Sequence, residues 1–144
     1  MTLVPAACAG FLLAVLWMDL IFDVQVLTDH DGALDSIAAY YRRATTTSRP
    51  MSALIVAVML ILLGALGFRW ASIGDPVWLM IALSALALVP IVLALLRTVP
   101  NAVRLGSRAD DAATQTRLAL AIFRDHVLCF GLMLAFLGLL LSTS

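Results

Sequence analysis

Long apolar runs separated by more polar segments dominate the sequence. They cover residues 3–27, 50–68, 76–98 and 118–141. A helix needs roughly 20 apolar residues to cross the hydrocarbon core of a bilayer, and each run supplies about that length. Consecutive helices joined by short connections run in opposite directions. The pattern therefore predicts an all-α protein, an integral membrane antiparallel four-helix bundle that forms a single domain over residues 1–144.

Prolines and acidic residues mark the expected ends of these helices. Pro90 lies inside the third run, where it predicts a kink, and Pro100 is expected to help end that helix. The fourth helix is expected to begin at Asp110 or Asp111, since aspartate is a favoured N-cap residue. Its first turns are amphipathic and become fully apolar only further along.

The segment between the first two runs has a helical pattern of its own. Its apolar residues recur at helical spacing, at Leu34, Ile37, Ala38 and Tyr41. Thr28, Asp29 and Asp31 supply N-cap chemistry just before them. The pattern predicts a short amphipathic helix that lies on the inner membrane surface, with Arg42 and Arg43 near anionic headgroups.

Composition supports a membrane protein. The chain is 63% hydrophobic and 12% charged, with a mean hydropathy of +1.06, whereas a soluble domain carries about 25% charged residues. The net charge is zero, so the sequence does not predict a basic surface for nucleic acid. All bases are Arg and all acids are Asp, a bias that indicates a GC-rich bacterial gene. The expected partner is therefore a lipid bilayer, the bacterial cytoplasmic (inner) membrane.

The arginines predict the orientation in that membrane. Seven of them fall near the first and third connections, at positions 42, 43, 49, 97, 104, 108 and 117, and only Arg69 lies on the opposite side. Positive charge marks cytoplasmic loops. We therefore expect a multi-pass protein with both termini on the outer side.

Two carboxylates, Asp19 and Asp23, lie one helical turn apart at the inner end of the first run. A carboxylate at membrane depth is costly and usually has a partner or a function. The residues expected at the same end as partners are Arg97, Asn101, Arg124 and His126. Arg124 aligns with Gly131, Ala135 and Gly138, small residues suited to contact with a neighbouring helix. This alignment predicts that Arg124 points into the bundle and pairs with Asp19.

Three interpretations of this polar cluster remain open on the sequence alone. It is a structural ion pair that fixes helix register, a catalytic or ligand pocket at the inner leaflet, or a carboxylate-rich metal site. As a catalytic pocket, it would use His126 as general base, Arg124 or Asn101 to stabilise an anion, and Asp19 to orient His126. Asp23 and Arg97 complete the expected binding set. The only histidines are His30 and His126, without ligand spacing, so no metal ligand is predicted. The sequence does not identify a cofactor.

Three short segments carry a resemblance to a known family. They are Val99-Pro100-Asn101-Ala102, Ile122-Phe123-Arg124-Asp125-His126, and the stretch from Leu34 to Arg43. Together with the four apolar runs, they resemble the anthrone-oxygenase-like family of small four-helix membrane proteins. The resemblance implies a cofactor-independent, oxygenase-like activity on an aromatic or polyketide compound.

Two functions follow as hypotheses. In the first, the protein is a membrane enzyme whose polar Asp/Arg/His pocket acts on a lipophilic or aromatic small molecule that enters from the bilayer. In the second, it is a non-catalytic accessory or assembly subunit that binds a membrane protein partner or a second copy of itself. The small size, short loops and small-residue stripes support the second hypothesis. The sequence alone does not decide between an enzyme and a subunit.

Overall fold

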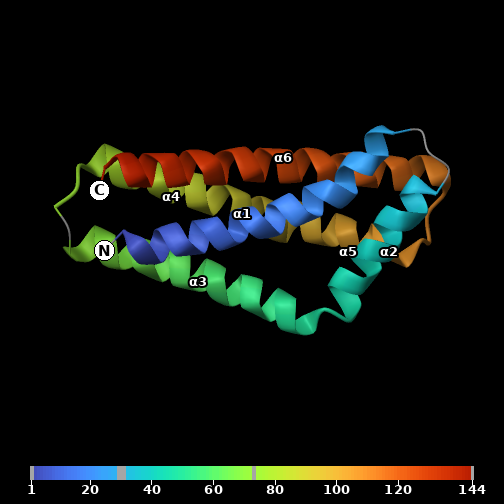
Figure 1. The fold of residues 1–144 in the computed structure, drawn as a ribbon, viewed down its shortest axis with the longest axis horizontal. Helices are drawn as coiled ribbons and strands as arrows, with labels where there is room; N and C mark the ends of the chain where they lie inside the picture. Colours follow the sequence, from blue (N-terminus) through green and yellow to red (C-terminus); the bar gives the residue numbers. More distant parts are fainter. Residues whose placement is uncertain (1, 29–31, 73, 144) are drawn as a thin grey trace.

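The computed structural model describes residues 2–28, 32–72 and 74–143, and helices joined by short connections account for nearly all of them (Figure 1). In chain order, the elements are α1 (Leu3–Asp23), the 3-10 turn η1 (Val24–Leu27), α2 (Ala33–Thr46), α3 (Arg49–Ser72), α4 (Val77–Leu93), the π-helical turn η2 (Ala94–Thr98), α5 (Val99–Ser107) and α6 (Ala112–Ser142). These described ranges contain no strand. The prediction of an all-helical chain is confirmed.

Four stretches of helix are long and apolar enough to cross a membrane. They are Leu3–Leu27, Arg49–Ser72, Val77–Ser107 and Ala112–Ser142. The chain ends lie together at one end of the molecule, and α2 and α5 lie at the other (Figure 1). The third and fourth stretches are longer than the apolar runs of the sequence, because their helices continue into amphipathic residues.

A hydrophobic core of apolar and small side chains joins the long helices near the chain ends. Leu62 of α3, Leu83 of α4 and Phe136 of α6 are fully buried there, and Leu12 of α1 packs with them. The most extensive contact in the molecule is between α1 and α6. This α1–α6 seam is the frame on which the polar residues further along both helices are held.

A second core joins α2 to α5 and α6. Ile37, Ala38 and Tyr41 of α2 are buried against these helices. The amphipathic helix predicted here is confirmed, but its apolar face is covered by protein. Asp29, His30 and Asp31 lie outside the described residues, so the predicted cap is not described, and the residue before α2 is Gly32 with a φ of 89°.

The crossing of α2 and α5 is unusually close at Gly106. A Cβ atom added at Gly106 would lie 2.8 Å from the backbone nitrogen of Arg42. Side-chain carbons do not approach a backbone this closely, so only glycine permits the crossing at this distance. Gly106 therefore sets how near α2 lies to α5.

The third long helix does not end at Pro100 as expected. It continues through the π-helical turn η2, in which the Val99 N–H bonds to the carbonyl of Ala94, and runs on as α5 to Ser107. A proline ring clashes with the carbonyl four residues earlier in a regular helix. The wider π turn directly before Pro100 relieves that clash. Pro90 lies within α4, one turn before this π turn, and the helix is continuous past both prolines.

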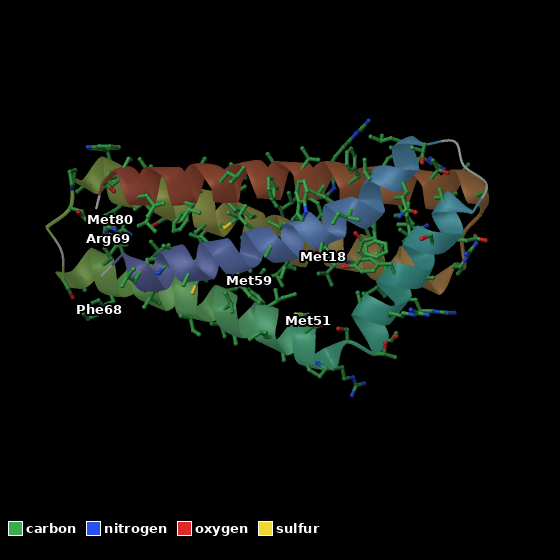
Figure 2. All side chains as sticks on the ribbon, in the orientation of Figure 1. Met18, Met51, Met59, Phe68, Arg69 and Met80 are labelled. Carbon is green, nitrogen blue, oxygen red and sulfur yellow. The ribbon has the colours of Figure 1, made fainter. Side chains whose placement is uncertain are left out.

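The other ends of the long helices have identifiable polar contacts. Asp111 caps α6, since its side chain accepts a hydrogen bond from the Thr114 N–H at 2.7 Å, and the predicted start of this helix is confirmed. Near the chain ends, Arg69 Nε lies 2.5 Å from Asp75 Oδ2, and both side chains are largely buried. Figure 2 places Arg69 near the turn between α3 and α4. This ion pair closes that turn.

Helix α3 is the least buried of the four long stretches. Residues 49–54 are all exposed, and packing of α3 against the core begins at Ile55. In Figure 1, α3 diverges from α1 toward the end where α2 lies. Figure 2 places Met18 of α1 and Met51 of α3 toward this diverging end, and both side chains are about half exposed. The bundle is therefore loosest beside α2.

Candidate functional site

The polar site is built where α1, α2 and α6 meet. The central contact joins His126 of α6 to Asp23 of α1, with Nδ1 2.6 Å from Oδ2. The Tyr41 hydroxyl of α2 donates to Oδ1 of the same carboxylate at 2.5 Å. Asp23 is 1% exposed and His126 is 7% exposed. Both oxygens of a fully buried carboxylate are thus satisfied by side chains from two other helices.

This geometry assigns the tautomer of His126. A carboxylate accepts hydrogen bonds only, so as its partner Nδ1 carries the proton that it donates. In neutral histidine, Nε2 then carries the lone pair. Nε2 lies 3.9 Å from Oδ2 of Asp19, beyond hydrogen-bond distance. The free nitrogen of His126 thus faces a second carboxylate across a gap.

Asp19 has a tyrosine of its own. The Tyr40 hydroxyl donates to its Oδ1 at 2.5 Å, and the Tyr40 ring stacks on Phe22, with centroids 4.1 Å apart. Asp19 is less buried than Asp23, with 19% of its side chain exposed. The site is therefore a pair of carboxylates, each bonded to a tyrosine, with His126 between them.

The two tyrosines act as neutral donors. Burial raises the pKa of Tyr41, and the negative charges of Asp23 and Asp19 raise it further. Burial and the Asp19 carboxylate raise the pKa of Tyr40 in the same way. Both hydroxyls therefore remain protonated well above neutral pH and keep their hydrogen bonds to the carboxylates.

Asp125, next to His126, belongs to a separate contact. Its Oδ2 lies 3.3 Å from Arg97 Nε and also accepts a hydrogen bond from Thr98 at 3.3 Å. Asp125 is buried, whereas 55% of the Arg97 side chain is exposed. Arg97 is thus the partner of Asp125, a pairing that the sequence did not single out, and it makes no ion pair with Asp19 or Asp23.

The ion pair expected between Asp19 and Arg124 is wrong. Arg124 is exposed and makes no ion pair among the described residues. The small residues aligned with it are exposed as well, and a methyl group added at Gly131 or Gly138 would meet no atom within 4 Å. Since α6 is apolar on most of its surface, spacing alone did not fix its rotation. The face that carries Arg124 points outward, and the face that carries His126 points inward.

Asn101 lies in α5 and is partly buried. Its side chain forms no hydrogen bond within the described ranges, so the structure does not join it to His126. Of the residues expected at the site, Asp19, Asp23 and His126 are brought together. Arg97 pairs with Asp125, the residue before His126. Arg124 and Asn101 are not part of the hydrogen-bonded group.

Sequence reasoning missed the functional contribution of Tyr40 and Tyr41. Tyr41 was recognised only as part of the apolar face of the connector. A buried tyrosine hydroxyl needs a hydrogen-bond partner, and the unpaired carboxylates at the end of α1 were the available acceptors. That requirement was the signal that could have linked α2 to α1.

A separate apolar groove of about 280 Å³ lies on the α1–α6 seam and is lined by Trp17, Leu20, Ile21, Val24, Phe123 and Val127. None of the hydrogen-bonded polar residues lines this groove. By helical geometry, the α1 lining positions lie on the face opposite Asp19, whereas Phe123 lies one turn before His126 on a neighbouring part of α6. Within the described parts of the chain, no group of three or more His, Cys, Asp and Glu side chains is arranged to hold a metal ion.

The site can support acid–base chemistry. A histidine held through Nδ1 by a buried carboxylate has a fixed orientation and a free Nε2, the arrangement that lets an imidazole act as a general base. Comparisons with known protein families, with curated proteins and with solved structures find no match to this chain. The resemblance to the anthrone-oxygenase-like family therefore stays a prediction.

Proposed function

We propose that this is an integral membrane protein of the bacterial cytoplasmic membrane, with four antiparallel spans and both termini outside. The four long apolar helices support membrane insertion. The chain ends and the α3–α4 turn, which holds Arg69 in an ion pair with Asp75, lie at one end (Figure 1). The remaining arginines belong to the other half of the bundle, which the positive-inside rule assigns to the cytoplasm.

We further propose that His126 is the general base of an enzyme site, oriented by Asp23. The observation that carries this proposal is the 2.6 Å contact of Nδ1 with a buried carboxylate, together with the absence of a hydrogen bond at Nε2 within the described residues. A register device would need the ion pair but would have no use for a free nitrogen. Asp19, 3.9 Å from Nε2, would stabilise the imidazolium after proton transfer.

The substrate of this base would be lipophilic. The exposed Met18 and Met51 side chains flank the place where α3 leaves α1, and Met18 directly precedes Asp19. Methionine surfaces adapt to varied apolar ligands. A molecule that entered from the bilayer there would approach the partly buried Tyr40 and Asp19. An oxygenase-like reaction on an aromatic compound, as the family resemblance implies, would begin with proton removal to give an enolate-like anion.

The change His126→Gln tests this role. Glutamine keeps a hydrogen-bonding amide but cannot take up a proton near neutral pH. With purified protein and candidate hydroxylated aromatic substrates, turnover should fall by roughly 10²–10⁴-fold, while helix content stays unchanged. Arg117→Gln, an exposed change on the same helix, is the control and should leave turnover intact. A folded and fully active His126→Gln protein would remove His126 from the mechanism.

A second candidate function is that of a subunit in a larger membrane assembly. The observation that favours it is the outward-facing stripe of Gly131, Ala135 and Gly138 on α6, since small residues let another helix approach closely. Gly131→Leu and Gly138→Leu add bulk at positions where a Cβ atom would meet no atom of another helix within 4 Å. They should disrupt a copurifying complex without unfolding the protein. Unchanged assembly in both variants would count against this face as an interface.

A further inference from the structure

A polar groove of about 360 Å³ lies beside the crossing of α2 and α5, away from the Asp23–His126 site. It is lined by Arg42, Thr45 and Thr46 of α2 and by Val103, Ser107 and Arg108 at the end of α5, with Gly106 between the helices. The groove exists because Gly106 allows the close crossing. That approach brings Arg42 and Arg108, 66 positions apart in the sequence, to one depression.

The guanidinium groups supply the free hydrogen-bond donors of this groove. Arg42 makes no ion pair or side-chain hydrogen bond with any described residue. Arg108 donates one N–H to Asp35, which leaves four of its five guanidinium donors for a ligand. The hydroxyls of Thr45, Thr46 and Ser107 already donate to carbonyls of their own helices. The groove thus offers positive charge and N–H groups but little that a cation would bind.

Among the described residues, one acid offsets part of this charge: Asp35 pairs with Arg108, and Arg42 has no acidic partner. The two acids that follow α5 are engaged outside the groove, Asp110 with Arg104 and Asp111 with the N-terminus of α6. Arg108 also holds its position in a left-handed backbone conformation, with a φ of 54°. A residue other than glycine costs energy in this backbone conformation. Its guanidinium links α2 to α5 and lines the groove.

We propose that the groove between Arg42 and Arg108 is a binding site for a phosphate group, carried by an anionic lipid headgroup or by a soluble phosphate ester. Guanidinium groups bind phosphate oxygens through paired N–H donors, which gives both strength and geometry. Val103, half exposed at the edge of the groove, offers an apolar surface for the remainder of the ligand. The proposal does not depend on the acid–base role of His126.

Binding to the intact protein in detergent tests this site. Calorimetric titration would use three probes: dihexanoyl phosphatidylglycerol, inorganic phosphate, and dihexanoylglycerol, which lacks phosphate. Arg42→Gln should weaken binding of the phosphate probes by about tenfold or more, the effect of losing charge-assisted hydrogen bonds. Arg43→Gln is the matched control, because Arg43 is exposed and unpaired but does not line the groove. It should change binding by less than about twofold.

A second pair of variants does not depend on how Arg42→Gln folds. Ser107→Asp places a carboxylate in the groove and should abolish phosphate binding, whereas Ala109→Asp adds the same charge outside it and should not. Binding of the lipid alone would identify a headgroup, and binding of inorganic phosphate as well would identify a soluble ligand. Equal losses in Arg42→Gln and Arg43→Gln, equal binding of dihexanoylglycerol, or no binding of either phosphate probe would overturn the proposal.

Discussion

Asp23 and His126 are 103 positions apart in the sequence, and their Oδ2 and Nδ1 atoms lie 2.6 Å apart in the structure. This contact joins α1 to α6 at the end of the bundle where the apolar core gives way to polar residues. Tyr41 of α2 completes it by donating to the other oxygen of the same carboxylate. Three helices are therefore connected through one buried side chain.

A double-mutant cycle should detect this connection. Asp23→Asn and His126→Gln should each destabilise the protein by about 1.5–3 kcal/mol, the usual contribution of a buried hydrogen bond to a charged group. Their coupling energy should be about 1–3 kcal/mol, since contacting residues do not contribute independently. The free energy of unfolding in detergent, measured for the two single variants and the double variant, gives this value.

The same cycle on Asp19→Asn and Arg124→Gln serves as the comparison. Arg124 is exposed, so these two changes should be additive, within about 0.5 kcal/mol. A large coupling between Asp19 and Arg124 would contradict the outward orientation of that face of α6.

The chain has only two tyrosines, which makes their ionisation directly visible. Because both pKa values are raised, the folded protein should show no tyrosinate absorption near pH 10, where free tyrosine titrates. The folded state then holds protons that the unfolded chain releases. Stability that is fully present below pH 10 should therefore fall as the pH rises above that value. Tyrosinate absorption near pH 10 in a protein with full helix content would contradict the two hydrogen bonds.

Gly106→Ala should separate α2 from α5. The added Cβ would lie 2.8 Å from the backbone of Arg42, and backbone atoms cannot move aside as a flexible side chain can. We expect a loss of about 1–3 kcal/mol in thermal or denaturant unfolding, the usual effect of overpacking. Gly10→Ala is the control, because a Cβ there meets no atom within 4 Å and alanine favours the helix by about 0.5–1 kcal/mol. Equal stability of the two variants would mean that the helices are not in close contact.

Orientation can be tested by cysteine labelling. Cys8 and Cys129 are buried and would be replaced by alanine first. Cysteines at Thr46 and Ser107 should then react with a membrane-impermeant maleimide only in inverted vesicles, and a cysteine at Thr143 only in intact cells. The reverse pattern would place the α2–α5 end of the protein outside the cell.

Much of the fold follows from the lengths of the apolar runs, because a helix that can span a membrane needs a continuous apolar stretch of about 20 residues. The residue pattern also identified α2, the cap at Asp111, and the gathering of Asp19, Asp23 and His126 at one end. The sequence could not give the rotation of α6. His126 and Arg124 are two positions apart and point in different directions, and the apolar residues all round α6 beyond them leave open which of the two faces inward.

The two remaining differences have the same kind of cause. The hydroxyls of Tyr40 and Tyr41 acquire their role only when α2 folds back on α1, a contact between distant segments that no local pattern encodes. Pro100 was expected to end a helix because it cannot donate a hydrogen bond. The preceding π turn instead absorbs the irregularity, and the helix continues.

That π turn also determines where this chain can change its length. Removing one residue from most positions in Val77–Ser107 would rotate everything beyond it by about 100° and carry the α2-binding face of α5 away from its partner. A π turn holds one residue more than an α turn over the same arc. A one-residue deletion within Ala94–Thr98 would therefore keep both packed faces in register. In such a shortened chain Pro100 would follow a regular α turn, where its ring clashes with the carbonyl four residues earlier. The extra residue of the π turn therefore allows the helix to continue past Pro100.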